Sequence, residues 1–170
     1  MDPSFAVVPV PWRRLETQAR VQIGGLGVVL IAEILDGPQH PIEVRFVAVA
    51  DAARIAHLRL PAAAKPALAV PGGLPAGTVL DVFTVEGFRR LGVARSLWSH
   101  ACATATAEHW AFQPRHSASR TPEGERYAKA VGGFVPPLAS ARYVECPDGV
   151  DPSSALWRGR LHLNLEAARG

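Results

Sequence analysis

The sequence predicts a mixed α/β fold in which a largely antiparallel sheet is followed by helices. Three observations support this fold class. Extended segments punctuated by glycine and proline fill residues 20–85, an amphipathic stretch covers residues 88–109, and a strand–helix–hairpin pattern follows over residues 110–163. With 170 residues, of which 48% are hydrophobic and 19% charged, the chain is typical of a single globular domain, residues 1–170.

The first half of the chain is predicted to consist of strands. Residues 20–35 are rich in Val, Ile and Leu and contain three glycines, which favours strands with a bulge or turn over a helix. Residues 42–47 and 55–60 alternate apolar and polar side chains, so we expect neighbouring half-buried strands joined as a hairpin. Residues 78–85 are again β-branched and apolar, which predicts a strand in the middle of the sheet.

Helices are predicted in the second half. Across residues 88–109 apolar side chains recur at three- and four-residue steps, as on one face of an amphipathic helix. Thr121 followed by Pro122 is typical of a helix start, and the glycine pair at 132–133 would end that helix. Three further segments are predicted as strands: residues 110–115, 139–146 and 155–163.

Composition and charge exclude several classes of protein. The excess of 18 Lys and Arg over 15 Asp and Glu is small, so no nucleic-acid partner is expected. The longest apolar run, residues 26–35, is too short to span a membrane, and the first residues lack a secretory signal, so we expect a cytoplasmic protein. Cys102 and Cys146 are isolated thiols, which indicates neither a disulfide framework nor a metal site.

The segment that carries chemistry is the predicted strand, tight turn and helix over residues 79–97. The beginning of this helix contains Arg89-x-x-Gly92-x-Ala94. A helix start presents unpaired backbone N–H groups and the positive end of the helix dipole, and together these bind phosphate. Gly92 lets a phosphate approach the backbone closely, and Arg89 and Arg90 add charged donors.

These residues resemble the cofactor motif of the GNAT N-acetyltransferase superfamily, in which a strand leads into a Q/R-x-x-G-x-G/A turn. The resemblance covers residues 42–163 and implies a GNAT-like fold with acetyl-CoA as the acyl donor. It implies that the backbone of Val82, Phe83 and Thr84 pairs with the pantetheine arm. The residues whose backbone amides would hold the diphosphate are Arg89, Arg90, Leu91, Gly92, Val93 and Ala94.

The reaction implied by this resemblance is direct transfer of an acetyl or other short acyl group from coenzyme A to an amine. No cysteine lies in a motif suited to a covalent intermediate. A GNAT-fold module that binds coenzyme A or a partner with little turnover is the alternative. An unrelated nucleotide-binding protein is disfavoured, because both the P-loop Gly-Lys-Ser/Thr and the Rossmann glycine triplet are missing.

Candidate catalytic residues follow less directly. Relatives often carry a tyrosine four residues before the glycine that ends the last helix, as general acid toward the thiolate. Here that position is Ala128, and Tyr127 lies one residue away, about 100° around a helix. His116 and Ser117, with Ser119 close by, follow the strand predicted to face the thioester, so they are candidates for moving a proton.

Charged residues supply the remaining candidates. Glu86, at a position where many relatives have proline, and Asp81 are candidate bases toward the amine. Arg120 and Arg126 are candidates for contact with the cofactor's 3′-phosphate.

The acceptor side departs from the family. Relatives have two helices after the first strand, whereas residues 20–60 are predicted here as strands. A broad, sheet-lined acceptor site is rarely left bare, so we expect a homodimer in which the N-terminal strands or the proline-rich loop 61–77 complete it. The size and identity of the amine acceptor are left open.

Overall fold

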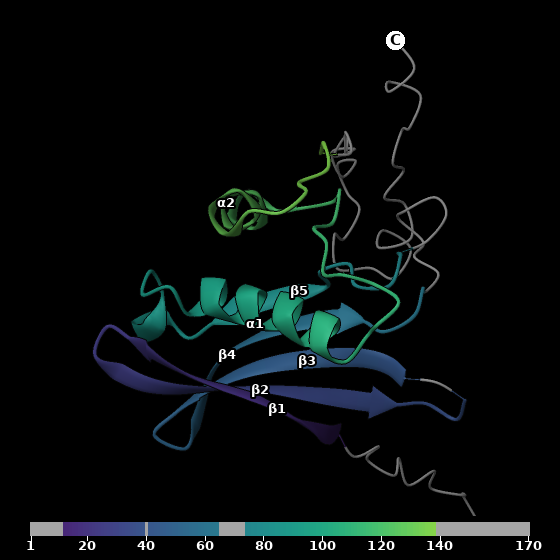
Figure 1. Ribbon diagram of the computed structural model, residues 1–170. Coiled ribbons are helices and arrows are strands. Elements are labelled where there is room, and N and C mark those ends of the chain that lie inside the picture. The colour runs from purple at the N-terminus through teal and green to yellow at the C-terminus, as the bar shows by residue number, and fades with distance from the viewer. Residues whose placement is uncertain (1–11, 40, 65–73, 139–170) are drawn as a thin grey trace, which may run out of the picture.

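The mixed α/β class is confirmed by the computed structural model, which describes residues 12–39, 41–64 and 74–138 (Figure 1). Five antiparallel strands form one sheet, and their order across the sheet is their order in the chain. The strands are β1 (Trp12–Ile23), β2 (Leu26–Asp36), β3 (Pro41–Ala50), β4 (Ala53–Pro61) and β5 (Asp81–Thr84). The helical elements are the short 3-10 helix η1 (Glu86–Phe88), α1 (Val93–Ala107) and α2 (Pro122–Val131).

The sheet is a meander of long strands joined by tight turns. Gly24 and Gly25 connect β1 to β2 with φ of 58° and 81°, and such left-handed pairs suit the right-handed twist of a hairpin. Asp51 and Ala52 connect β3 to β4 in the same way, with φ of 48° and 61°. The predicted hairpin between residues 42–47 and 55–60 is therefore confirmed, with both strands longer than the alternation indicated.

The hydrophobic core lies between α1 and one face of the sheet. Leu30, Phe46 and Leu58 come from three neighbouring strands, project toward the helix and are fully buried. Leu97 and Ala101, one turn apart on α1, pack onto them. Both helices lie on this side of the sheet, with α2 stacked over the beginning of α1 (Figure 1).

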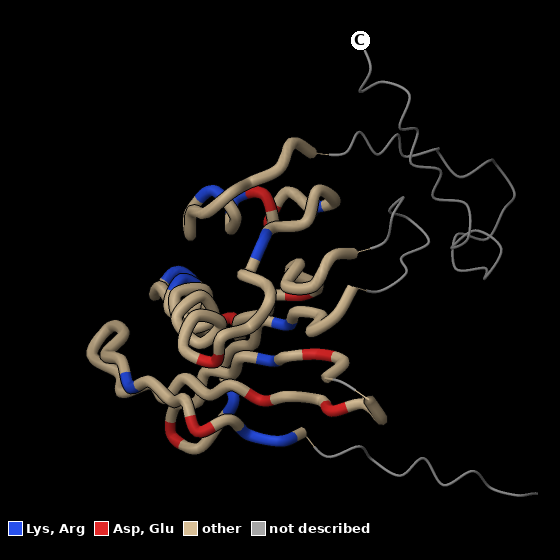
Figure 2. The backbone as a smooth tube through the Cα atoms, turned by 45° about the vertical axis from the view of Figure 1, so that its right-hand side comes forward, with Lys and Arg blue, Asp and Glu red and all other residues tan. Residues whose placement is uncertain are grey.

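Acidic and basic residues recur along neighbouring strands of the sheet (Figure 2), and cross-strand charge pairs form on the face opposite α1. Glu33 on β2 is buried and accepts hydrogen bonds from Arg45 on β3 at 2.6 Å and from Arg54 on β4 at 3.2 Å. Arg59 on β4 reaches back to the buried Glu43 on β3. A buried carboxylate is tolerated only when it is paired and hydrogen-bonded, so these arginines make the polar face compatible with long, buried strands.

The structure corrects the predicted start of the first helix. The amphipathic pattern indicated a helix from Phe88, but regular helix begins only at Val93. Arg90 and Gly92 have φ of 64° and 93°, values that a right-handed helix cannot contain. The residues after β5 therefore form η1 and a turn, and Gly92 becomes the N-cap of α1.

Two strand predictions are also corrected. The strand expected over residues 78–85 in the middle of the sheet is the four-residue β5, which lies at an edge of the described sheet. The strand expected over residues 110–115 is reduced to a single parallel bridge between Arg115 and Thr78. The Val79 amide donates to the Arg115 carbonyl and the Arg115 amide donates to the Gly77 carbonyl, both at 2.9 Å.

The second predicted helix is confirmed as α2. The Thr121 side chain caps it by accepting a hydrogen bond from the Gly124 amide at 3.1 Å, Pro122 is its first residue and Gly132 follows its end. The predicted strands at 139–146 and 155–163 lie outside the described residues. No helix in the described ranges has both the length and the apolar character needed to cross a membrane.

Gly77 offers a test of how the loop before β5 is held. Its φ is 79°, and a Cβ there would lie 2.5 Å from the Gln113 carbonyl oxygen and 2.7 Å from the Phe112 ring. We expect Gly77→Ala to lower the free energy of unfolding by about 2 kcal/mol or more, because both backbone strain and a clash are introduced.

Gly87→Ala is the matched control for this substitution. A Cβ at Gly87 would meet nothing within 4 Å, and its φ is not positive, so stability should stay close to that of the unmodified chain. Urea unfolding of both variants measures the difference. Equal stabilities would show that the close approach of Gly77 to residues 112–113 does not constrain the fold.

Candidate functional site

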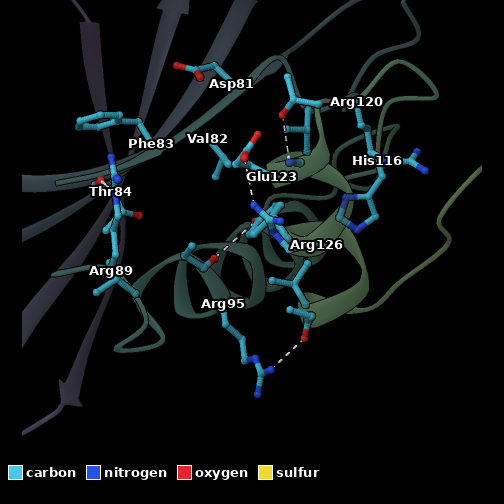
Figure 3. Close-up of a pocket in the computed structure, with 18 of the residues that line it drawn as sticks. Asp81, Val82, Phe83, Thr84, Arg89, Arg95, His116, Arg120, Glu123 and Arg126 are labelled. Carbon is cyan, nitrogen blue, oxygen red and sulfur yellow. Dashed lines mark hydrogen bonds and ion pairs between the residues drawn. The ribbon is translucent and has the colours of Figure 1, made fainter. Parts of the chain in front are cut away.

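A cavity of about 960 Å³ lies where β5, the beginning of α1 and α2 meet (Figure 3). Residues from four segments line it: the strand residues 79–84, the turn and first helical residues 88–95, the connection 116–121, and one side of α2. These segments are brought together because α1 packs on the sheet with its first residues beside β5, and α2 packs on α1. All residues of the predicted motif from Arg89 to Ala94 lie in its wall.

The wall at the start of α1 is rich in unpaired backbone donors. The first helical bond of this end runs from the Ser96 amide to the Gly92 carbonyl at 3.0 Å. Within the described ranges, the amides of residues 90–95 have no hydrogen-bond acceptor. A Cβ on Gly92 would meet nothing within 4 Å, so the space in front of these amides is open. The arrangement is suited to an anion.

Three arginines lie near these amides, and they differ in whether their guanidinium groups are hydrogen-bonded to the protein. Arg89 donates from Nε to the Thr84 carbonyl at 3.0 Å, and Arg95 donates to the Ala130 carbonyl at 2.9 Å. Arg90 lines the cavity, and its guanidinium makes no hydrogen bond to any described residue. Arg90 is therefore the arginine of this turn that is most available to an incoming anion.

The edge of β5 that faces away from β4 forms another part of the cavity wall. Among the described strands β5 pairs only with β4, with His57 opposite Phe83 and Leu58 opposite Val82. Val82, Phe83 and Thr84 all line the cavity. An edge without a partner strand offers backbone N–H and C=O groups to an extended ligand, and the pairing of these three residues with a pantetheine arm stays a prediction.

Arg120 and Arg126, the candidates for phosphate contact, have different environments. Arg120 is buried and bonds to the Glu125 carboxylate and to the carbonyls of Ser117 and Pro136. The bond to Pro136 holds the segment before α2 against the segment after it, and the bond to Glu125 holds it to the helix itself. Arg120 is therefore a structural residue, although it also lines the cavity. Arg126 is exposed at the cavity wall and pairs with Glu123, one turn away, at 3.0 Å.

His116 is a packed residue of the cavity wall. Its ring stacks on Trp98 with centroids 4.2 Å apart, and its Nε2 donates to the Gly132 carbonyl at 2.8 Å. Burial lowers the pKa of this imidazole, which is therefore neutral at pH 7. Since a carbonyl can only accept, Nε2 carries the hydrogen and the lone pair is on Nδ1.

Tyr127 also lines the cavity, despite its one-residue offset from the family's position. Its hydroxyl lies 3.5 Å from the Ala94 carbonyl oxygen, and its ring packs edge-on against Trp98. Ala128, at the family's position, is fully buried and does not line the cavity. Burial raises the pKa of Tyr127 far above that of a free phenol, so the hydroxyl holds its proton tightly.

The other candidate residues are divided between the cavity and its surroundings. Ser117 and Ser119 line the cavity, and the Ser117 hydroxyl accepts a hydrogen bond from the Ser119 amide at 3.1 Å. Glu86 is exposed on η1 and is not part of the wall. Asp81 is part of the wall, and its carboxylate is hydrogen-bonded to His57.

His57 is the residue that sequence reasoning missed. The alternation across residues 55–60 placed it on the polar side of its strand, but only the pairing of β4 with β5 brings it to Asp81. In the described part of the chain no group of three or more His, Cys, Asp or Glu residues could hold a metal ion.

Comparison with known proteins gives limited information about this chain. No family model and no curated protein matches it. A solved structure to which it is similar is that of a ribosomal-protein-alanine N-acetyltransferase from Brucella melitensis biovar Abortus 2308. The two share 19% identity, the match covers 60% of this chain and 68% of the other, and the TM-score is 0.43. This likeness is too distant to carry an argument about the site.

Two buried histidines predict a pH dependence of stability. Burial lowers the pKa of His100, against the core, and of His116, in the cavity wall, so both stay neutral in the folded chain at pH values where the unfolded chain is protonated. Stability should therefore fall as the pH drops below about 6.5, by up to about 1.4 kcal/mol per pH unit for each histidine.

Urea unfolding between pH 7.5 and 5 measures this slope. His100→Phe keeps an aromatic ring edge-on to Phe46 and removes a buried Nε2 that has no described partner, so it should reduce the slope. An unchanged slope in this variant would contradict the assignment of His100 as a neutral core residue.

Proposed function

We propose that this protein is an N-acyltransferase that moves an acetyl or other short acyl group from coenzyme A to an amine. The observation that carries the proposal is a single continuous cavity wall. It joins the amides of residues 90–95 to the outer edge of β5, and in the described part of the chain these amides have no hydrogen-bond acceptor and this edge has no partner strand. Coenzyme A has the matching form, because a diphosphate is attached to an extended arm that ends in the reactive thioester.

The diphosphate would lie against the start of α1. There the amides and the helix dipole supply positive potential, and Arg90 supplies a guanidinium that bonds to no described residue. The pantetheine arm would follow β5, with its amides bonded to the backbone of residues 82–84 as an added strand. Backbone N–H groups of this strand would also stabilise the negative charge that develops on the thioester oxygen during attack.

Transfer would be direct. The amine nitrogen attacks the thioester carbonyl carbon, the N–C bond forms, and the C–S bond breaks. Cys102 on α1 is absent from the cavity wall, and burial raises the pKa of its thiol, so this residue is unsuited to carry the acyl group.

A coenzyme A-binding module with little turnover is the second candidate. Glu86 is outside the cavity, His116 is packed against Trp98, and the Tyr127 hydroxyl holds its proton tightly. Three of the candidate proton carriers are therefore poorly placed for catalysis. Turnover with acetyl-CoA and a panel of primary amines, followed by thiol release, separates the two candidates.

Gly92 provides the test of the binding site. Gly92→Glu would place a carboxylate in the anion site and should abolish binding of coenzyme A. Gly92→Gln introduces the same backbone strain and nearly the same volume without the charge, so it is the matched control.

We expect the affinity of the Glu variant to be at least about 10-fold lower than that of the Gln variant, the equivalent of a repulsion of ~1.4 kcal/mol. Calorimetric titration with coenzyme A measures both, and circular dichroism checks that both variants fold. Equal affinities in two folded variants would sink the proposed binding site.

Tyr127 provides the test of the proton path. A positioned general acid contributes about 10²- to 10⁴-fold to the rate, whereas we expect Tyr127→Phe to lower kcat by less than about 100-fold. The physical reason is burial, which raises the pKa of the phenol and opposes proton donation. A larger loss of kcat, with coenzyme A affinity unchanged, would restore the tyrosine as the acid.

The acceptor side stays a proposal. Both helices lie on one side of the sheet, and in the described part of the chain no helix covers the other face (Figure 1). The proposed homodimer, in which N-terminal strands or the loop 61–77 complete the acceptor site, would supply that cover.

A further inference from the structure

Asp81 lines the cavity and is hydrogen-bonded to His57 on the neighbouring strand β4, which is not itself a lining residue. The distance from His57 Nε2 to Asp81 Oδ2 is 2.7 Å. Asp81 is the first residue of β5, while the last, Thr84, leads into η1 and the start of α1. With a rise of about 3.3 Å per residue, the pair is displaced by about 10 Å along the strand from Thr84. A ligand that is anchored at α1 and follows β5 would therefore extend toward this pair.

The pair lies at the edge of the polar face of the sheet. Successive side chains of a strand point to opposite faces, so Asp81 and Phe83 point away from α1 while Val82 packs toward the core. His57 is directly opposite Phe83 in the ladder and diagonal to Asp81. Because β5 is an edge strand in the described sheet, Asp81 contributes both to the cavity wall and to the polar face.

The hydrogen bond determines which ring nitrogen can accept a proton. A carboxylate only accepts, so Nε2 of His57 carries the hydrogen and Nδ1 carries the lone pair. Nδ1 has no hydrogen-bond partner among residues 12–39, 41–64 and 74–138, and the His57 side chain is 32% exposed. Phe83 stacks on the imidazole with centroids 5.7 Å apart and planes 28° apart, so the ring is held from two sides.

Other polar contacts on this face are of a different kind. The carboxylates of Glu33 and Glu43 are buried under arginines, which are permanently charged and cannot exchange a proton. Asp81 instead pairs with a histidine, whose imidazole can accept and release a proton. Asp81 also differs from Glu33 and Glu43 in lining the cavity.

We propose that His57, oriented by Asp81, is the base that removes a proton from the acceptor amine, an inference that rests on the proposed acyl transfer. An ammonium acceptor gives one proton to Nδ1 of His57, and this frees the nitrogen lone pair. The nitrogen then forms the N–C bond with the thioester carbon, the C–S bond breaks, and the second nitrogen proton goes to the departing thiolate. His57 returns its proton to water. Asp81 stabilises the imidazolium in between.

The test uses acetyl-CoA and a panel of small primary amines with the full chain. His57→Gln should lower kcat by about 100-fold or more, the range of a positioned base, with little change in coenzyme A affinity. Asp81→Asn should give a smaller loss, and the double variant should be no slower than His57→Gln, because the two residues act as a unit. Added imidazole should restore part of the activity of His57→Ala, which a purely structural role would not allow.

Asp36→Asn is the matched control. It removes the carboxylate of another exposed cross-strand pair, Arg13–Asp36 at 2.7 Å between β1 and β2, and should leave kcat unchanged. Full activity of His57→Gln, or absence of imidazole rescue, would overturn the base assignment while leaving acyl transfer in place. If the unmodified chain releases no thiol with any amine, the base assignment and the transferase proposal fail together, and calorimetry then shows whether coenzyme A binding remains.

Discussion

The packing of α1 across one face of the sheet is the constraint on which the rest of the structure depends. Leu97 and Ala101 bury this helix against Phe46 and its neighbours, and this contact determines where the helix begins. Arg90 and Gly92 have positive φ values, so the chain turns between β5 and α1 and the helix cannot begin before Val93. The result is a helix start whose amides have no hydrogen-bond acceptor among the described residues, beside a strand edge with no described partner strand, which is the combination that the proposed function needs.

The two faces of the sheet are adapted to different tasks. The inner face is apolar and holds both helices, whereas the outer face carries buried carboxylates under arginines. The buried carboxylates of Glu33 and Glu43 are compatible with folding because each is paired with an arginine of a neighbouring strand. His57 and Asp81 extend the same cross-strand pattern to the edge at β5, but with a titratable base in place of an arginine. Under our proposals, coenzyme A and the amine acceptor would thus lie on opposite sides of this strand edge.

Sequence patterns were most informative where local physics decides the structure. The caps of α2 are local, since Thr121, Pro122 and Gly132 each act on backbone groups within a few residues, and this helix was predicted with its correct ends. The start of α1 was predicted five residues too early, because the apolar periodicity continues through a turn that only the backbone angles reveal. The reduced pairing of residues 110–115 has a tertiary cause, namely the close approach of Gly77 to residues 112–113.

By itself, the sequence determined the class of fold and the strand-rich first half, because alternation and turn chemistry act over short distances. It also located the turn Arg89-x-x-Gly92-x-Ala94 at the start of the long helix. Only the tertiary structure decided which side chains share a site. It placed Tyr127 in the cavity wall, Glu86 outside it, and Arg120 in an internal network. It also brought His57 to Asp81 across 24 residues of chain, through a strand pairing whose register no local pattern specifies.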